Sequence, residues 1–223
     1  MEFYVYAFIL ILLPIFNYYR TKKQQAGAAS KEHGYLLMHL IYWATLLWIV
    51  CVSPLGELFW PATTVTFALL WRIVLWILIG YVTLTTIVPL ALMPYNQQFK
   101  EMVRSHYDDR LYPTTTSQQI QFAFVTLTVG ICEEIIYRGF MYHSFIDQFA
   151  LSPTMSYLIT SVLFGASHFM QGLRGISNSV MFGLIMGYLC MVTGSLLLPI
   201  IIHTAYNLRA IYIARVTVQR TEI

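Results

Sequence analysis

Seven long apolar segments constrain this chain more than any other feature of its sequence. A helix needs about 20 predominantly apolar residues to cross a bilayer, and a helix satisfies its own backbone hydrogen bonds there. The pattern therefore predicts an all-α integral membrane protein, a bundle of about seven transmembrane helices. The predicted segments are approximately Phe3–Tyr19, Tyr35–Ser53, Val65–Met93, Gln119–His143, Thr154–Phe169, Ile176–Thr193 and Ser195–Ile213.

The composition agrees with the membrane class and excludes others. Of the 223 residues, 58% are hydrophobic and 10% are charged, whereas a soluble domain carries about 25% charged residues. The net charge of +3 is small, and no basic stripe is interleaved with aromatic residues, so the sequence does not indicate nucleic-acid binding. The lipid bilayer is the expected surrounding.

The positive charges predict an orientation. Basic residues follow the first segment, are absent from the second loop, Pro54 to Thr64, and return after the last segment. By the positive-inside rule, the amino terminus is expected outside and the carboxyl terminus in the cytoplasm. The expected location is the bacterial inner (cytoplasmic) membrane. The basic residues after the first and last segments are Arg20, Lys22, Lys23, Lys31, Arg209, Arg215 and Arg220.

Polar residues interrupt three of the apolar segments. Each charged group near the middle of a spanning helix costs about 2.5–3.5 kcal/mol on insertion scales, so their retention indicates chemistry. Each of the other two clusters pairs a histidine with a residue four positions away, a spacing that places both on one helix face. The clusters are Glu133-Glu134 with Arg138, Phe164 with His168, and His203 with Asn207.

The spacing within these clusters suggests a division of labour. Glu134 and Arg138 are four residues apart and can pair on one helix face, which leaves Glu133, pointing about 100° away, free for another partner. A carboxylate and a neutral imidazole can activate water as general bases or as metal ligands. His and Asn donors can stabilise the oxyanion of a tetrahedral intermediate. No HExxH, GxSxG or P-loop motif offers another site.

Other polar or small residues have simpler interpretations. Gly183 and Gly187 form a GxxxG pattern, which predicts close helix packing. Four histidines near predicted segment ends or loops are expected to be solvated or interfacial: His33, His39, His106 and His143.

The order EExxxR, FxxxH and HxxxN resembles the CPBP family of intramembrane proteases, which comprises CAAX proteases and bacteriocin-processing enzymes and is also called the Abi family. The resemblance covers roughly residues 119–209, and the first three segments carry no recognised motif. It implies a four-helix catalytic core over residues 119–213. Residues 1–118 would then form an amino-terminal part with three transmembrane helices and polar loops, and residues 214–223 a carboxyl-terminal tail.

The resemblance also implies roles for the clustered residues. Glu133 and His168 would activate the attacking water, His203 and Asn207 would form the oxyanion hole, and Glu134 and Arg138 would support the geometry. Phe164 would contact the substrate. A Zn²⁺ ion held by Glu133, His168 and His203 is compatible with these residue types, as is a metal-independent glutamate mechanism, with a slight preference for the family's metalloprotease designation.

The sequence thus predicts an endopeptidase that cleaves near the carboxyl terminus of a membrane-embedded or membrane-tethered peptide or protein. The small size suits a prokaryotic member, with precursor processing, sorting or self-immunity as the expected tasks. Two alternatives stay open: a non-catalytic immunity or binding protein, and a proton or metal transporter. A transporter predicts internal symmetry, which the sequence does not display.

Overall fold

The computed structural model describes residues 2–53, 69–105, 110 and 112–218, and within them the chain is helical without strands. This confirms the predicted all-α membrane bundle. Five helices are long and apolar enough to cross a membrane: Lys31–Val52, Leu69–Leu92, Thr116–Asp147, Phe169–Thr193 and Leu197–Val216. The start of the predicted Val65–Met93 segment, the second loop, His106 and Arg220 lie outside the described residues.

Two further segments predicted to cross are helical but differ from the expectation. Residues 2–25 form one continuous helix, built from α1 (Glu2–Ala7), the π-helical η1 (Phe8–Leu12) and α2 (Leu13–Gln25). The helix predicted over Thr154–Phe169 is shorter than expected: α10 (Pro153–Ala166) has 14 residues, about 21 Å at 1.5 Å per residue. A hydrocarbon core of about 30 Å exceeds that length, so seven full crossings stay a prediction.

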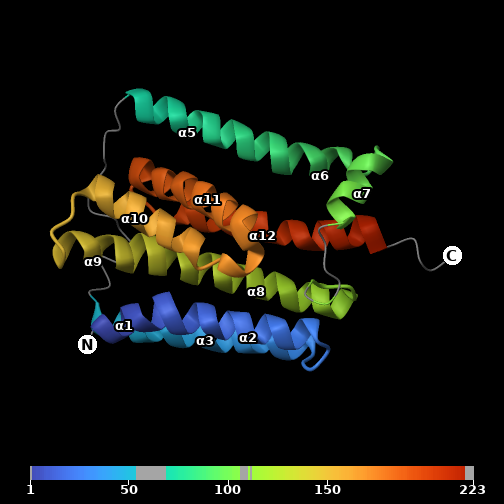
Figure 1. Ribbon diagram of the computed structural model, residues 1–223, viewed down its shortest axis with the longest axis horizontal. Coiled ribbons are helices and arrows are strands. Elements are labelled where there is room, and N and C mark those ends of the chain that lie inside the picture. Colours follow the sequence, from blue (N-terminus) through green and yellow to red (C-terminus); the bar gives the residue numbers. More distant parts are fainter. Residues whose placement is uncertain (1, 54–68, 106–109, 111, 219–223) are drawn as a thin grey trace.

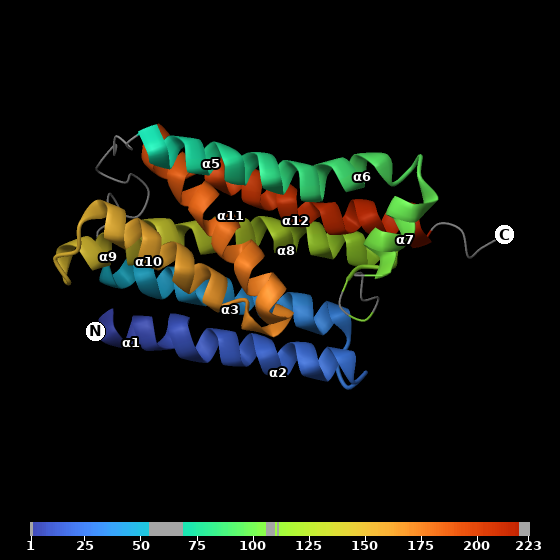
Figure 2. The same cartoon turned by 45° about the horizontal axis from the view of Figure 1, so that its top comes forward.

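Consecutive long helices run antiparallel along the longest axis, and the two termini lie at opposite ends (Figure 1). Helices α1 and α2 lie on one side of the bundle, and α5 and α6 lie on the other, in both views (Figure 2). The remaining elements are α3 (Lys31–Val52), α5 (Leu69–Val82), η2 (Thr83–Ile87), α6 (Val88–Leu92), α7 (Gln97–Ser105), α8 (Thr116–Glu134), η3 (Ile135–Met141), α9 (Tyr142–Asp147), η4 (Phe169–Gln171), α11 (Gly172–Thr193) and α12 (Leu197–Val218).

The segment from α8 to α9 forms the centre of the bundle. It is 61% buried over its most apolar window, whereas the corresponding window of Leu69–Leu92 is 11% buried. Helix α8 packs against both α3 and α12. Local signals define its start, because the Thr115 hydroxyl accepts from the Gln118 amide as an N-cap. The π-helical η3 follows directly after Glu134, and π-turns of this kind are frequent at functional sites.

The GxxxG pattern is a packing contact, as predicted. Helix α11 lies against α10, and a Cβ at Gly187 would sit 2.7 Å from the Tyr157 ring. A Cβ at Gly183 would sit 3.1 Å from the Ser161 carbonyl oxygen. The approach at Gly187 is shorter than real Cβ contacts, and the approach at Gly183 is tighter than most of them, so the two helices depend on small residues here.

We expect Gly187→Val to destabilise the protein by about 1–3 kcal/mol, because the added side chain forces α10 and α11 apart. The matched control is Gly80→Ala on α5, where an added Cβ meets no atom within 4 Å and a gain in helix propensity is expected. Thermal unfolding in detergent measures both. Equal midpoints for the two variants would contradict the packing account.

The division of the chain at residues 118 and 213 stays a prediction. The structure does show that the amino-terminal part is not separate from the rest, because α3 packs against α8.

Candidate active site

The two adjacent glutamates lie at the end of α8, in the middle of the bundle. Glu133 is 6% exposed and Glu134 is fully buried. Because they are consecutive on a helix, their side chains leave its axis about 100° apart. They therefore point in different directions, as the sequence predicts, and both reach His203, from opposite sides of its ring.

Glu134 anchors a buried polar network. Its Oε1 accepts from Arg138 Nη1 at 3.1 Å and contacts His203 Nδ1 at 2.7 Å. Arg138 also donates through Nη2 to the Gly183 carbonyl at 3.1 Å. Since an ionised carboxylate only accepts hydrogen bonds, His203 Nδ1 must be the donor in this pair. The pairing of Glu134 with Arg138 was predicted, and the bond to His203 extends it to α12.

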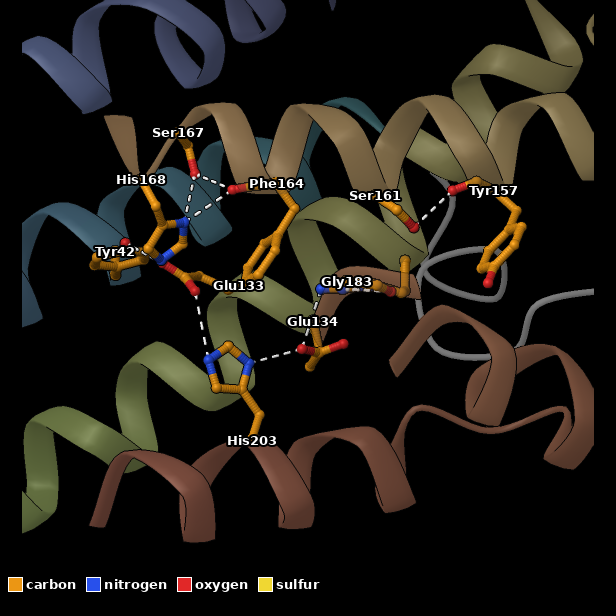
Figure 3. A network of polar contacts seen from close by, with 11 residues as sticks. Tyr42, Glu133, Glu134, Tyr157, Ser161, Phe164, Ser167, His168, Gly183 and His203 are labelled. Atoms are coloured by element: carbon orange, nitrogen blue, oxygen red, sulfur yellow. Dashed lines mark hydrogen bonds and ion pairs between the residues drawn. The ribbon is translucent and has the colours of Figure 1, made fainter. Parts of the chain in front are cut away.

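Glu133 faces the other side of the same histidine (Figure 3). Tyr42 on α3 donates its phenolic hydrogen to Glu133 Oε1 at 2.5 Å. Glu133 Oε2 lies 3.6 Å from His203 Nε2, which is longer than a direct hydrogen bond. Among the described residues this oxygen has no hydrogen-bond partner. One oxygen of Glu133 is thus held and oriented, and the other is available to a ligand.

His168 does not lie within a spanning helix, contrary to the prediction. Helix α10 ends at Ala166, and His168 occupies the turn that precedes η4. Its Nδ1 lies 2.8 Å from the Phe164 carbonyl, which is an acceptor, so Nδ1 donates and Nε2 carries the free lone pair in the neutral ring. The turn therefore presents Nε2 as the nitrogen that can accept a proton.

The Phe164 ring is packed among the site residues. It is 2% exposed, its centroid lies 4.6 Å from the Arg138 guanidinium carbon and 4.9 Å from the His168 ring. It also meets the His203 ring edge-on at 5.9 Å. These contacts hold the two histidines and the arginine in place. The predicted contact with substrate stays a prediction.

One cavity brings most of the predicted residues together. Its volume is about 710 Å³, and Glu133, Phe164, His168, His203 and Asn207 all line it. Asn207 lies one helical turn after His203 on α12, as its spacing indicates. Glu134 and Arg138 lie behind this surface and act through His203. The geometry therefore separates residues that can touch a ligand from residues that position them.

The predicted zinc ligands have suitable chemistry but are not gathered into a cluster. Both histidines hold Nδ1 in a hydrogen bond and leave Nε2 for another partner, an arrangement common around metal-bound histidines. Within the described part of the chain, however, no group of three or more His, Cys, Asp or Glu residues is arranged to hold a metal ion.

The sequence reasoning missed Tyr42, because the first three segments carry no motif. A signal existed: His39 and Tyr42 are polar residues three apart within an apolar helix, hence on one flank of it. His39 is partly exposed, and its Nδ1 contacts the Thr128 hydroxyl at 2.8 Å, between α3 and α8; its interfacial position stays a prediction. The expectation that His143 is solvated or interfacial was wrong, since it is buried in α9.

We expect Tyr42→Phe to lower kcat about ten- to a hundredfold and to leave KM nearly unchanged. The variant removes one hydrogen bond to a charged group, worth about 1.5–3 kcal/mol, with 1.4 kcal/mol per factor of ten. Tyr19→Phe, at an exposed position, is the matched control and should match the wild type. A rise in KM with kcat unchanged would place Tyr42 in substrate binding instead.

Comparison with known proteins supports the family resemblance predicted from the three polar clusters. Residues 115–209 match the family model described as type II CAAX prenyl endopeptidase Rce1-like, which covers under half of the chain. No curated protein and no solved structure gives a match. The matched segment contains the three polar clusters, and the match confirms the resemblance to CAAX proteases. The roles of the individual residues stay predictions.

Proposed function

We propose that this chain, whose residues 115–209 match the Rce1-like endopeptidase family model, hydrolyses a peptide bond near the carboxyl terminus of a membrane-associated protein or peptide. The observation that carries the proposal is the buried Glu133 carboxylate, which lines a cavity together with two histidines and an asparagine. The description of the matched family supports a carboxyl-terminal cleavage site. Its prenylated substrates are one option, and peptide precursors are another.

In the proposed reaction, Glu133 is the general base. Its unpartnered Oε2 accepts a proton from a water, and the Nε2 lone pair of His168 accepts a hydrogen bond from the same water and orients it. The water oxygen attacks the scissile carbonyl carbon and forms a tetrahedral intermediate. The C–N bond then breaks, and the proton held by Glu133 passes to the leaving amine. Water and one peptide bond yield one carboxylate and one protonated amine, because the second proton of the water also passes to the amine.

Asn207 and His203 are assigned to the developing oxyanion. The Asn207 amide supplies one donor. Because His203 Nδ1 donates to Glu134, its Nε2 can donate to the oxyanion only in the imidazolium form. In that form, the charges of Glu133, Glu134, Arg138 and His203 sum to zero. The pair Glu134–Arg138 holds the ring and is a positioning element, because neither residue lines the cavity.

A resident Zn²⁺ stays part of the proposal as an alternative water activator. Glu133, His168 and His203 would hold it, and it would lower the pKa of a bound water. This requires the three side chains to move together from the arrangement described above.

The bundle supports the proposed orientation, with the carboxyl terminus in the cytoplasm. Basic residues gather at one end: Arg110 donates to the Gln25 carbonyl, Lys31 to the Tyr112 carbonyl and Arg215 to the Gln119 side chain. The first two contacts join the end of α2 and the start of α3 to the segment that precedes α8. The third joins the end of α12 to the start of α8. A concentration of basic residues at one end is what the positive-inside rule requires of the cytoplasmic face.

The proposed function is tested with purified protein in liposomes and a library of amino-terminally acylated peptides, with mass spectrometry of the products. The expected result is cleavage at one bond near the carboxyl terminus. Parallel reactions with a zinc chelator, and with added Zn²⁺ afterwards, decide between the two activators. If no peptide or protein substrate is cleaved while the protein remains folded, the non-catalytic alternative replaces this proposal.

A further inference from the structure

Arg20, on α2, lines the same cavity as Glu133 but belongs to none of the motifs. It is half-buried, and its Nη1 donates to the buried Gln24 side chain at 3.0 Å. Its Nε is buried and has no hydrogen-bond partner among the described residues. The arginine is thus held in one place with part of its donor capacity unused.

Within the part of the chain that the structure describes, no acidic side chain forms an ion pair with this arginine. Glu133 is the only acidic residue among the described residues that line the cavity, and Tyr42 already holds one of its oxygens. The cavity's other arginine, Arg209, is engaged differently: its Nη1 donates to the Tyr206 carbonyl at 2.6 Å, and its guanidinium carbon lies 3.5 Å from the Tyr206 ring centroid. A partly desolvated cation without a counter-ion is unfavourable, so Arg20 favours an anionic ligand.

Neighbouring residues on α2 and α3 fix the position of the Arg20 side chain. Gly34 on α3 lies beside it: a Cβ at Gly34 would sit 3.2 Å from Arg20 Nη1 and 2.8 Å from Gln24 Cδ. Gln24 Nε2 lies 3.4 Å from the Ser30 carbonyl, which ties it to the start of α3. The glycine and the buried glutamine therefore make room for the guanidinium and orient it.

The distance from Arg20 to the reactive carboxylate suits a short peptide. Eight residues of α3 separate Gly34, beside Arg20, from Tyr42, whose hydroxyl contacts Glu133. At 1.5 Å per residue this is about 12 Å along the helix. An extended peptide covers about 12 Å with roughly four residues. A chain bound at Glu133 can therefore place its end at Arg20.

We propose that Arg20 binds the free α-carboxylate at the substrate's carboxyl terminus and thereby sets how far from that end the chain is cleaved. The planar guanidinium matches a carboxylate in shape and charge. This inference rests on the proposed function and adds a specificity residue to it. Arg209 contributes positive potential, but its guanidinium is stacked on the Tyr206 ring and donates through Nη1 to the Tyr206 carbonyl.

The test uses pairs of amino-terminally palmitoylated peptides that differ only in a free carboxylate or a carboxamide at the carboxyl terminus. We expect the wild type to cleave the acid with a kcat/KM at least about tenfold higher, as expected for a charge-assisted hydrogen bond. In Arg20→Gln, kcat/KM should fall for the acid peptide and stay unchanged for the amide peptide, so the preference is lost. Arg20→Lys should keep part of the preference. Lys23→Gln removes an exposed charge from the same helix end and should behave as the wild type.

Two outcomes would overturn the inference and leave the proposed function standing: equal cleavage of acid and amide by the wild type, or an equal loss for both in Arg20→Gln. A binding measurement separates the two proposals if nothing is cleaved. Fluorescence anisotropy with the Glu133→Gln protein in phosphatidylcholine nanodiscs should show tighter binding of the acid. Equal binding of both forms would show that Arg20 does not bind the carboxylate. An acid preference that phosphatidylglycerol abolishes would show that Arg20 binds a lipid phosphate instead.

Discussion

Glu133→Gln is expected to lower kcat by about a thousandfold and to leave substrate binding intact. The amide has nearly the shape of the carboxylate and can still accept from Tyr42 through its oxygen. It cannot take a proton from water, and a positioned general base contributes about 10²–10⁴-fold. Kinetics in liposomes and peptide binding to the variant measure the two effects separately.

A matched control distinguishes this loss from a general charge effect. Glu101→Gln on α7 makes the same chemical change at an exposed position, and its activity should equal that of the wild type. If Glu133→Gln retained wild-type kcat, Glu133 would not be the base.

Arg138→Leu is expected to be the most destabilising substitution at the site. The salt bridge with Glu134 is buried, with side chains 4% and 0% exposed. Removing one partner of such a pair costs about 3–5 kcal/mol, because the other charge stays buried without compensation. The variant also loses the bond to the Gly183 carbonyl and the contact with Phe164. Thermal unfolding in detergent and peptide cleavage should both show large losses.

The double variant Glu134→Leu/Arg138→Leu separates stability from activity. Replacing both charged partners is often neutral for stability, so much of the lost stability should return. Activity should not return, because His203 then lacks the carboxylate that fixes its ring. Recovery of full activity in the double variant would show that Glu134 does not position His203.

Much of the fold could be predicted from the lengths of the apolar segments. The Glu134–Arg138 pair of the site could be predicted from residue spacing along one helix. The pairing of Glu134 with Arg138 could be predicted because residues four apart on a helix meet without any tertiary contact. The GxxxG packing of α10 against α11 is similarly a property of small residues on one helix face.

The rest of the site depends on packing that local patterns do not encode. His203 lies between Glu133 and Glu134 because α12 packs on α8, and the chain separation of these residues carries no such information. Tyr42 reaches Glu133 from α3, outside every motif. The end of α10 at Ala166 was also missed, since Phe164 and His168 approach each other in a turn at the same spacing that suits a helix.

The most direct test of the account is cleavage in H₂¹⁸O by wild type and Glu133→Gln side by side, followed by mass spectrometry of both products. We predict one ¹⁸O atom in the new carboxylate of the wild-type product, because solvent water attacks the scissile carbonyl. The Glu133→Gln variant should form product about a thousandfold more slowly than the wild type. Labelled product at the same rate from both proteins, or no product from the wild type with any peptide substrate, would contradict the account.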